Sequence, residues 1–486
     1  MSRFDVAIIG GGLGSLETAL VLSKEGMNVC VVERCHETGG LFQSFRRHGY
    51  TIDTSIHYVG SMDKGEALHR CFSYFGILDE IDYVRLNEKS FDNIYVEDSH
   101  YSYAMGLDNF EESLHHQFPS DRDAIKDYCK SVRKVGEISN IEVLKNRIFT
   151  MDYMDYVTMA ASQEIKKCSQ NPGFFDALWG TSLLYAGIED ITPFYIHAIT
   201  LYSNLSGACR FRGGTSAVTD AMVRKIEENG GVVLKGAEVT RIMVERDSVK
   251  GLVLADGRRI ESNNVISGIH PAETFRILDD NSVIKPSFIS RIFNEKNSYG
   301  LFCLYLLIKP GTMRYRNENY FIRKGNNRVN YVLLSMQPPV NNPGYAEVVT
   351  IVTPVALEDF DKWNNGKHGD RSVEYIEYKE SMSDELLDFV SDKFPELKGS
   401  ISYKYSATPL TFKDYTATPQ GSAYGIQKNY NKPFSTFIAT RTKLSGLFLT
   451  GQNINVHGVL GVTISSLLTS AELLGGNYLI DKLKNI

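Results

Sequence analysis

The first residues of the chain combine an apolar run with a cluster of glycines. Residues 4–9 are mostly β-branched or apolar, which predicts a buried strand of a parallel sheet, and residues 16–25 have the spacing of a helix. Gly10, Gly12 and Gly14 lie between them in the stretch VAIIGGGLGSLETA. Gly10 permits a sharp turn, Gly12 lets the backbone approach a pyrophosphate, and the helix directs its free N–H groups at that anion. The pattern favours a nucleotide site over a merely structural turn.

The next apolar run carries an acid at the position that a dinucleotide site requires. Residues 28–35 predict a second strand, and Glu33 lies 19 residues after Gly14. A carboxylate at a spacing of about 20 residues accepts hydrogen bonds from a ribose. The third glycine of the usual fingerprint is replaced by Ser15, which is small enough for close helix packing. Strand, glycine turn, helix, strand and acid together predict a dinucleotide-binding site.

Later regions of the chain differ in their periodicity. Residues 230–268 alternate apolar and polar positions between glycine turns, which is typical of a small antiparallel meander whose end returns to the nucleotide domain. Residues 106–204 have helical periodicity, and residues 297–353 contain strand-like runs. We therefore expect an α/β fold with a Rossmann-type nucleotide-binding domain and an inserted α+β substrate domain. The first would comprise residues 1–75, 205–290 and 435–486, and the second residues 76–204 and 291–434.

Composition and charge narrow the classes of partner. The chain has 486 residues, 43% of them hydrophobic, which suffices for more than one core. A formal net charge of −6 without a Lys/Arg block argues against nucleic acid as a partner. Seven cysteines without a clustered framework indicate reduced thiols, and the chain enters a strand at once without a secretory leader. We therefore expect a cytoplasmic protein.

One apolar stretch near the end of the chain bears on membrane association. Residues 458–476 include many small and hydroxyl side chains and also Glu472. The stretch therefore falls short of the roughly 18 uninterrupted apolar residues of a membrane-spanning helix. Contact with a membrane is expected to be peripheral, at its inner surface.

The residues after Glu33 carry a resemblance to a known family. The stretch ETGGLFQSFRRHGYTIDTSIHYVG contains a second glycine pair, Gly39 and Gly40, then Ser44, and then Asp53 before the loop IHYVG. In these features the sequence resembles the FAD-dependent phytoene desaturase superfamily, and within it the branch of retinol saturases and carotenoid cis-trans isomerases. Similar blocks continue to the end of the chain, at residues 182–187, 209–242, 408–425 and 446–468.

The resemblance implies FAD as the cofactor and a glutathione reductase-like form of the Rossmann domain. It implies a set of cofactor-binding residues: Gly10, Gly12, Gly14, Ser15, Glu33, Arg34, Gly39, Gly40, Leu41, Ser44, His57, Val239, Gly451, Gln452, Asn453, Gly461 and Val462. Val239 would lie near the adenine, although its residue type is equally compatible with a core position.

Some positions depart from the pattern of the family. The arginines that often flank the second glycine pair are replaced by Glu37 and Leu41, so backbone N–H groups would meet most of the pyrophosphate charge. Asn453 stands where the family usually has Asp, and Ser55 replaces a usual glycine. An amide oxygen can still accept a hydrogen bond, so none of these changes removes the expected site.

Other patterns limit the chemistry. Cys30 and Cys35 have the spacing of a redox disulfide, but they precede the second glycine pair and Cys30 lies within a predicted strand, so we expect structural thiols. No metal site is expected, because the histidines lack ligand spacing.

The stretch FRGGTS at 211–216 lacks a suitable strand before it, so a second nucleotide domain is not predicted. One flavin would therefore exchange electrons with an external donor or acceptor.

The family suggests an apolar conjugated polyene as the substrate, and 27 Tyr and 25 Phe residues are available to line an apolar tunnel. Saturation, desaturation and cis-trans isomerisation share one cofactor geometry. Reduction of a double bond needs a proton opposite the hydride, and the resemblance places His57 and Tyr58 near the flavin as candidate donors. A purely structural His57 is an equal alternative. A flavin amine oxidase and a prenyl-binding escort protein without flavin are the competing functions, and the intact Gly10–Glu33 pattern argues against the second.

Overall fold

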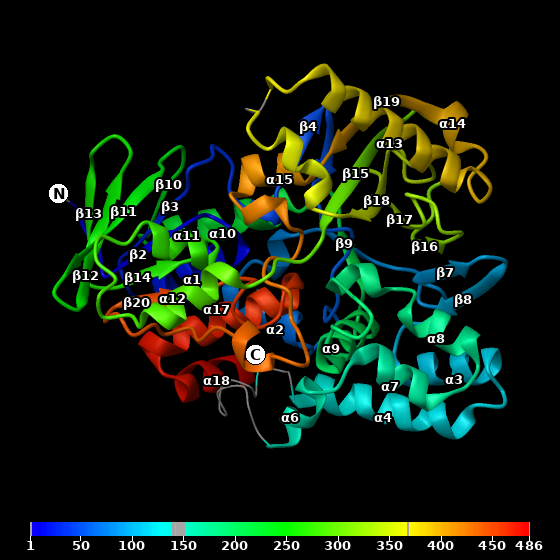
Figure 1. Ribbon diagram of the computed structural model, residues 1–486, viewed down its shortest axis with the longest axis horizontal. Coiled ribbons are helices and arrows are strands. Elements are labelled where there is room, and N and C mark those ends of the chain that lie inside the picture. Colours follow the sequence, from blue (N-terminus) through cyan, green and yellow to red (C-terminus); the bar gives the residue numbers. More distant parts are fainter. Residues whose placement is uncertain (1, 139–140, 142–150, 367–368, 486) are drawn as a thin grey trace.

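The computed structural model describes residues 2–138, 141, 151–366 and 369–485. Five short apolar strands form a parallel sheet in the order β10-β3-β2-β14-β20 (Figure 1). These strands are β2 (Val6–Ile9), β3 (Val29–Val32), β10 (Val232–Leu234), β14 (Val265–Ser267) and β20 (Leu447–Leu449). The sheet has the parallel α/β arrangement expected from the sequence.

The two faces of this sheet are covered by different layers. In β2, Val6 and Ile8 belong to one hydrophobic core while Ala7 and Ile9 belong to another, because successive side chains of a strand point to opposite faces. The first face packs against helices: α1 (Leu13–Lys24), α2 (Ala67–Phe75), α10 (Ser216–Glu228), α17 (Gly458–Leu474) and α18 (Gly476–Lys484). The second face is covered by a small sheet together with α11 (Pro271–Arg276) and α12 (Pro286–Asn294).

The small covering sheet is the meander predicted from residues 230–268. Its strands are β1 (Ser2–Arg3), β11 (Val239–Glu245), β12 (Ser248–Leu254) and β13 (Arg259–Glu261), in the order β1-β13-β12-β11. The prediction started this meander too early, because β10 instead extends the parallel sheet by pairing with β3. As predicted, the end of the region returns to the nucleotide-binding part, where β14 pairs with β2.

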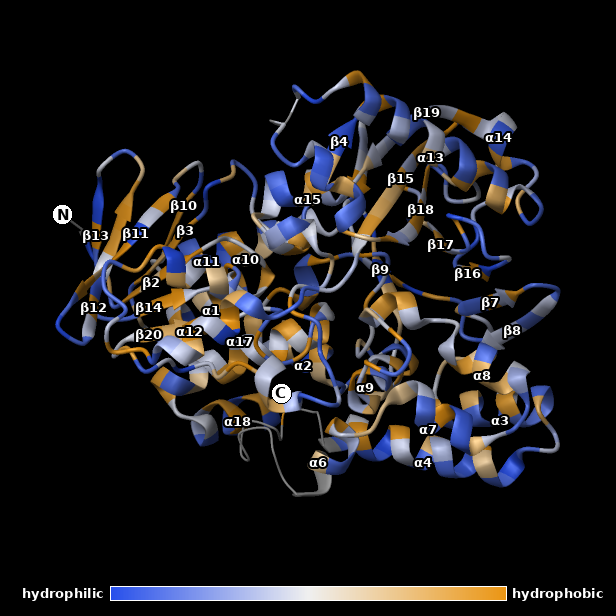
Figure 2. Ribbon diagram, in the orientation of Figure 1, coloured by the Kyte–Doolittle hydropathy of each residue, from blue (hydrophilic) through white to orange (hydrophobic). Residues whose placement is uncertain are grey.

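A second, seven-stranded sheet has the order β19-β15-β18-β17-β16-β7-β8, and all its pairs are antiparallel except β16 with β7. Its strands are β7 (Asp92–Val96), β8 (Ser99–Tyr103), β15 (Gly300–Ile308), β16 (Asn319–Arg323), β17 (Tyr331–Met336), β18 (Val348–Val355) and β19 (Ile401–Ala407). Every residue of β15 is buried, and this strand is mostly hydrophobic in Figure 2. The sheet therefore has a hydrophobic layer on each face.

The layers on this sheet come from two groups of helices. The long helix α13 (Val373–Ser391) covers one face. The other face is covered by helices of residues 107–205: α3 (Leu107–Gln117), α4 (Arg122–Ile138), α6 (Met151–Val157), α7 (Ala161–Cys168), α8 (Pro172–Trp179) and α9 (Phe194–Leu205). The helical prediction for 106–204 is confirmed there, with residues 139–140 and 142–150 outside the described part. The domain limits drawn from the sequence stay a prediction.

Shorter elements connect these layers. They comprise the hairpin β4 (Ser44–Arg47) with β5 (Tyr50–Asp53), the pair β6 (Tyr83–Arg85) with β9 (Cys209–Phe211), the helices α14 (Leu397–Ser400), α15 (Pro409–Thr416) and α16 (Pro433–Thr436), and the 3₁₀ turns η1 (Gly40–Phe42), η2 (Leu78–Glu80), η3 (Ser182–Tyr185), η4 (Glu358–Trp363) and η5 (Pro419–Gly421). Within the described residues, every helix is too short or too polar to cross a membrane. Most of the apolar stretch at residues 458–476 forms α17, which packs against α1 inside the protein.

The contact between α1 and α17 encloses an acid. Glu17 is fully buried, and Thr463 on α17 donates a hydrogen bond to its Oε1 at 2.7 Å. Its Oε2 has no protein partner. Burial raises the pKa of Glu17 to about 8. An uncompensated carboxylate here would be costly, so the folded protein holds Glu17 protonated at neutral pH.

This pKa predicts a pH-dependent stability. Between its ordinary pKa near 4.3 and about 8, the folded state binds one proton more than the unfolded state, so the free energy of unfolding falls as pH rises through this window. Glu17→Gln should remove this contribution and stabilise the protein more at pH 8.5 than at pH 5.5. Urea unfolding at both pH values measures the difference, with exposed Glu227→Gln on α10 as the control. An equal effect of Glu17→Gln at both pH values would contradict the prediction.

Candidate functional site

The turn between β2 and α1 forms one wall of a cleft at the carboxyl end of the parallel sheet. Gly10 has a φ of +85°, which favours glycine, and its N–H donates to the carbonyl of Val32 at 2.8 Å. Gly12 is the N-cap of α1, and a Cβ added there would meet no atom within 4 Å. The open space in front of Gly12 is therefore a cradle into which the first N–H groups of α1 can direct hydrogen bonds.

The next two residues pack α1 against the rest of the site. A Cβ on Gly14 would lie 3.0 Å from Gly451 Cα and 3.0 Å from a methyl group of Val462. Gly14 thus provides the close packing that the third fingerprint glycine usually provides. Ser15 beside it is buried, and its Oγ lacks a protein partner while the residue lines the cleft. An unpaired hydroxyl at a helix N-terminus fits a ligand that carries acceptor oxygens.

Glu33 lies directly after β3 and lines the same cleft. Its Oε2 accepts the N–H of Gly11 at 2.5 Å, and its Oε1 accepts the N–H of Cys35 at 2.7 Å. These two bonds orient the carboxylate while leaving lone pairs for a further donor. The arrangement suits the ribose hydroxyl for which the sequence spacing predicts an acceptor.

The second glycine pair closes on the first turn. Gly39 has a φ of +111°, and its N–H donates to the carbonyl of Gly11 at 2.7 Å. A Cβ on Gly40, whose φ is +60°, would lie 3.3 Å from Gly12 Cα. The two turns therefore approach each other so closely that a side chain on Gly40 would be crowded by the backbone of Gly12. Next to them, the guanidinium of Arg34 donates to the carbonyl of Asp414 at 2.6 Å.

Most of the residues expected to bind the cofactor line this one cleft, whose volume is about 370 Å³. They are Gly10, Gly12, Gly14, Ser15, Glu33, Arg34, Gly39, Gly40, Leu41, Val239, Gly451, Gln452, Asn453 and Val462. The Oδ1 of Asn453 already accepts the N–H of Ile426 at 2.9 Å, so this amide also holds the neighbouring loop. His57 and Gly461 do not line the cleft but an adjoining pocket.

Ser44 lines neither the cleft nor the pocket, so its contact with the cofactor stays a prediction. Its hydroxyl donates to Oδ1 of Asp53 at 2.7 Å, and that same oxygen accepts the N–H of Thr215 at 2.7 Å. Burial raises the pKa of Asp53. Ser44 and Asp53 therefore join the β4–β5 hairpin to the start of α10. The family resemblance gave no sign of this internal hydrogen bond.

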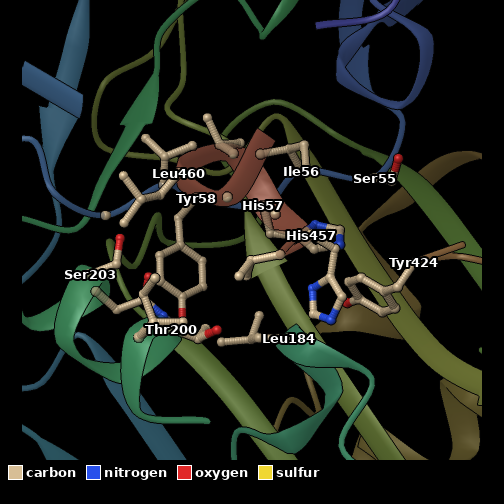
Figure 3. A pocket seen from close by; sticks show the side chains of 18 of the residues that line it. Ser55, Ile56, His57, Tyr58, Leu184, Thr200, Ser203, Tyr424, His457 and Leu460 are labelled. Carbon is tan, nitrogen blue, oxygen red and sulfur yellow. The ribbon is translucent and has the colours of Figure 1, made fainter. Parts of the chain in front are cut away.

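The adjoining pocket continues from the end of the cleft. Six residues line both: Ser55, Ile56, Leu301, Tyr424, Gly458 and Val459. Figure 3 shows His57, His457 and Tyr424 gathered on one side of the pocket, with Tyr58, Thr200 and Ser203 on another. The segment after β5 therefore connects the nucleotide cleft to a second chamber, whose volume is about 110 Å³.

His57 is held in the pocket by a neutral contact of its ring and a charged contact of its backbone. Its Nδ1 lies 3.3 Å from Ser335 Oγ, and its backbone carbonyl accepts the Nε–H of Arg210 at 3.1 Å. The Nε2 atom is buried and has no protein partner. Burial, together with the charge of Arg210, lowers the pKa of His57 to about 4. The imidazole is therefore neutral at pH 7 and has one nitrogen available to a ligand.

Tyr58 belongs to a hydrogen-bond network. Its hydroxyl donates to Asp92 Oδ2 at 2.8 Å and accepts the amide N–H of Asn204 at 3.2 Å. Burial raises the pKa of Tyr58 well above 10, and the nearby Asp92 adds to this shift. The phenol therefore keeps its proton at every physiological pH, and its position is determined by groups from two elements, β7 and α9.

Sequence reasoning did not single out several residues of the pocket. Tyr424 donates its hydroxyl to the carbonyl of Leu183 at 2.5 Å, and its ring lies 4.9 Å from that of His457. Burial lowers the pKa of His457 to about 3, so this ring is also neutral. Tyr424 and His457 lie in blocks that carry the family resemblance, but nothing local indicates that they would meet each other or Leu301 on β15.

The cysteines fit the structural role expected from the sequence. All seven are free, and burial raises the pKa of Cys30 to about 12. Burial also raises the pKa of Cys35, so neither thiol is poised to be a reactive thiolate. Within the described residues, no group of three His, Cys, Asp or Glu side chains could hold a metal ion.

The open cradle at Gly12 predicts that a side chain would displace the nucleotide. The φ of −70° at Gly12 accommodates any L-residue, so Gly12→Val should fold and yet purify with at least about tenfold less bound flavin. Flavin released on denaturation, measured by fluorescence per mole of protein, gives the occupancy. Gly344→Val is the matched control, because Gly344 is exposed and its Cβ position is also open. Normal flavin content in Gly12→Val would contradict the assignment of the cradle.

Proteins of known name resemble this chain along almost its whole length. An all-trans-retinol 13,14-reductase of Danio rerio is 24% identical, with 97% of this chain and 86% of the relative covered. Prolycopene isomerase 1 of an Oncidium hybrid cultivar is 23% identical, with 96% and 83% covered. The fold is similar to that of an oxidoreductase from Methanosarcina mazei, with a TM-score of 0.64, 18% identity, and 96% of this chain and 99% of that chain covered.

The cofactor follows from the site and from the family together. The open cradle at Gly12, the unpaired hydroxyl of Ser15 and the oriented carboxylate of Glu33 fit an adenine dinucleotide. The family described as "Flavin containing amine oxidoreductase" matches residues 16–307, which is more than half of the chain. The chain belongs to this family of flavin oxidoreductases, and its cofactor is FAD.

Proposed function

We propose that the protein is an FAD-dependent oxidoreductase that acts on carbon–carbon double bonds of an apolar conjugated polyene. The observation that carries the proposal is the pocket that continues from the nucleotide cleft through six shared residues. Its lining contains no Asp, Glu, Lys or Arg. The two kinds of relative named above, a retinol reductase and a prolycopene isomerase, are both named for polyene substrates.

The uncharged lining favours a polyene over an amine. A protonated amine that leaves water needs a carboxylate or an aromatic cage for its charge. Tyr58 and Tyr424 are the tyrosines among the described lining residues, and they lie on different sides of the pocket (Figure 3). Leu183, Leu184 and Leu301 instead provide apolar contacts, so an uncharged substrate loses less on entering. At about 110 Å³ the chamber holds only the reacting segment of a long polyene, and the remainder of the substrate would extend beyond it.

Bound FAD supplies or accepts a hydride at one carbon of a double bond. A group of the protein must then deliver a proton to the neighbouring carbon or remove one from it. His57, with its pKa lowered to about 4 by burial, is neutral at pH 7 and cannot act as an imidazolium acid. Tyr58 keeps its proton and lines the pocket. We therefore assign proton transfer to Tyr58 and a positioning contact, through its unpaired Nε2, to His57.

For saturation or desaturation, electrons must come from or go to a partner outside the chain. The strand β9 before Gly213 and Gly214 pairs antiparallel with β6, and α10 follows, so this second glycine turn does not belong to a parallel nucleotide fold. A Cβ on Gly214 would press against Thr51 and Ser44. We include an external electron donor or acceptor in the proposal, and peripheral contact with a membrane as the source of the apolar substrate.

A panel experiment tests this function. The purified holoprotein, with its flavin either oxidised or chemically reduced, is incubated without oxygen with retinoids, carotenoids and primary amines. Mass spectrometry then distinguishes the products: a gain of two hydrogens marks saturation, a loss of two marks desaturation, and an unchanged mass with altered retention marks isomerisation. Reaction of an amine and of no polyene would overturn the proposal in favour of an amine oxidase.

Two substitutions separate the roles of the adjacent side chains. Tyr58→Phe should lower the rate of polyene turnover by about 10²–10⁴-fold, because the proton donor is lost. His57→Gln keeps a hydrogen-bonding group and should have a smaller effect, mainly on KM. Both variants should retain normal flavin content, measured by absorbance, since neither residue lines the nucleotide cleft. An unchanged turnover rate in Tyr58→Phe removes it as the donor.

A further inference from the structure

A buried polar group formed by three distant segments is hydrogen-bonded to the hydroxyl of Tyr58 but does not line the pocket. Asp92 is the first residue of β7 and Asn319 is the first residue of β16, and these residues are register partners in the parallel pair. Arg210 lies on β9. All three are at least 96% buried, and none of them lines the pocket or the cleft. Among the described residues, Tyr58 is the one whose side chain connects them to the pocket.

The hydrogen bonds of this group all lead to the carboxylate of Asp92. The guanidinium of Arg210 donates to Asn319 Oδ1 at 2.5 Å, and Asn319 Nδ2 donates to Asp92 Oδ1 at 2.7 Å. Asn319 thus stands between the cation and the carboxylate. The other carboxylate oxygen, Oδ2, accepts the hydroxyl of Tyr58 at 2.8 Å. Each oxygen of Asp92 therefore has a different side-chain partner, and Oδ2 is the one that can carry a proton without losing the amide.

Burial and hydrogen bonding have opposite effects on the pKa of Asp92. Burial raises the pKa of Asp92 to about 7, although hydrogen bonds from Asn319 and Tyr58 and the charge of Arg210 act in the opposite direction. The other titratable groups that face it are Tyr103, on the neighbouring strand β8, and Tyr331, on β17. Burial raises the pKa of both phenols, so they stay neutral. Arg210, whose backbone-facing Nε–H binds the carbonyl of His57, is the cation of the group.

The two protonation states of Asp92 direct the proton of Tyr58 differently. When Asp92 is a carboxylate, the phenol donates its proton to Oδ2, away from any substrate. When Oδ2 carries a proton, it donates to the Tyr58 oxygen, which also accepts from Asn204. Both lone pairs of the phenol are then occupied by donors, so its own O–H is released from Asp92 and is available to a group in the pocket that Tyr58 lines. Protonation of a residue outside the pocket therefore prepares the donor inside it.

We propose that Asp92 stores the proton that Tyr58 delivers to the substrate, with Asn319 and Arg210 holding Asp92 in place. This inference rests on the proposed function in its saturating direction. The O–H bond of Tyr58 breaks as a C–H bond forms on the carbon next to the one that receives the electron pair from the cofactor. At the same time the O–H bond of Asp92 breaks and the proton moves to the Tyr58 oxygen, so no phenolate forms. After product leaves, a proton from water in the pocket returns to Asp92 through Tyr58.

The pH dependence of the reduction rate tests whether Asp92 supplies the proton. Because the protonated form of Asp92 is the active one, the rate at which the pre-reduced holoenzyme reduces its polyene should fall about tenfold between pH 6 and pH 8. Asp92→Asn should lower the rate at pH 6 by about 10²-fold and abolish this pH step. The matched control is Tyr103→Phe, which removes a buried phenol beside Asp92 whose hydroxyl binds the carbonyl of Ala177. That control should keep both the rate and the step.

Infrared titration of the holoprotein without substrate provides a readout that does not depend on turnover. A buried carboxylic acid band should titrate near pH 7, disappear in Asp92→Asn and shift in Tyr58→Phe. Glu17 is a second buried acid, with a pKa raised by burial to about 8, so the measurement uses a Glu17→Gln background. Because Glu17 lies between α1 and α17, its removal leaves the Asp92 group intact.

The outcomes separate this inference from the proposed function. Polyene reduction with an unchanged pH step in Asp92→Asn, or no infrared band assignable to Asp92, overturns the proton store and leaves the proposed function standing. Absence of reaction with every polyene overturns the proposed function, and the inference with it. A pH step and an infrared band that both depend on Asp92 support the store.

Discussion

The close approach of glycine backbones at one end of the parallel sheet is the constraint on which the rest of the site depends. Gly39 binds the carbonyl of Gly11, Gly40 lies against Gly12, and Gly14 lies against Gly451. Three segments far apart in the sequence therefore meet within van der Waals distance around the N-terminus of α1. Backbone N–H groups, whose positions are determined by the sheet, can face a pyrophosphate there without the charged side chains that the family often uses. The substitutions at Glu37 and Leu41 are tolerable for this reason.

The position of the pocket depends on the position of the glycine cradle, because the two sites share lining residues. The segment that leaves the β4–β5 hairpin passes the end of the cleft and then supplies His57 and Tyr58 to the chamber. The hairpin itself is attached to α10 through Ser44, Asp53 and Thr215. A displacement of α10 would therefore move both the cleft and the pocket. Polar groups that touch no ligand thus determine where the reacting bond of a substrate could lie.

Glu17, Asp53 and Asp92, the buried acids in the described part of the chain, have different consequences because their partners differ. Glu17 accepts the hydroxyl of Thr463 and remains protonated at neutral pH, so stability is lost as pH rises from its ordinary pKa to about 8. Asp53 accepts from a backbone N–H, two hydroxyls and an amide, and so holds elements together. Asp92 has an amide on one oxygen and a phenol on the other. Burial raises the pKa of each, and the arrangement of donors decides whether the group is structural or can exchange a proton.

The amino-acid sequence by itself determined the nucleotide module. The order of strand, glycine turn, helix, strand and Glu33 is local, and a dinucleotide site needs those residue types at those spacings whatever surrounds them. The family resemblance extended this to the second glycine pair and to the Gly451–Asn453 segment, and these residues do line one cleft. Only the tertiary structure decided that Ser44 binds Asp53, that Tyr424 meets His457, and that Asp92 accepts the hydroxyl of Tyr58. Asp92 and Asn319 are joined by the pairing of β7 with β16, across more than 200 residues of sequence. The burial that raises the pKa of Asp92 therefore exists only once the seven-stranded sheet has formed.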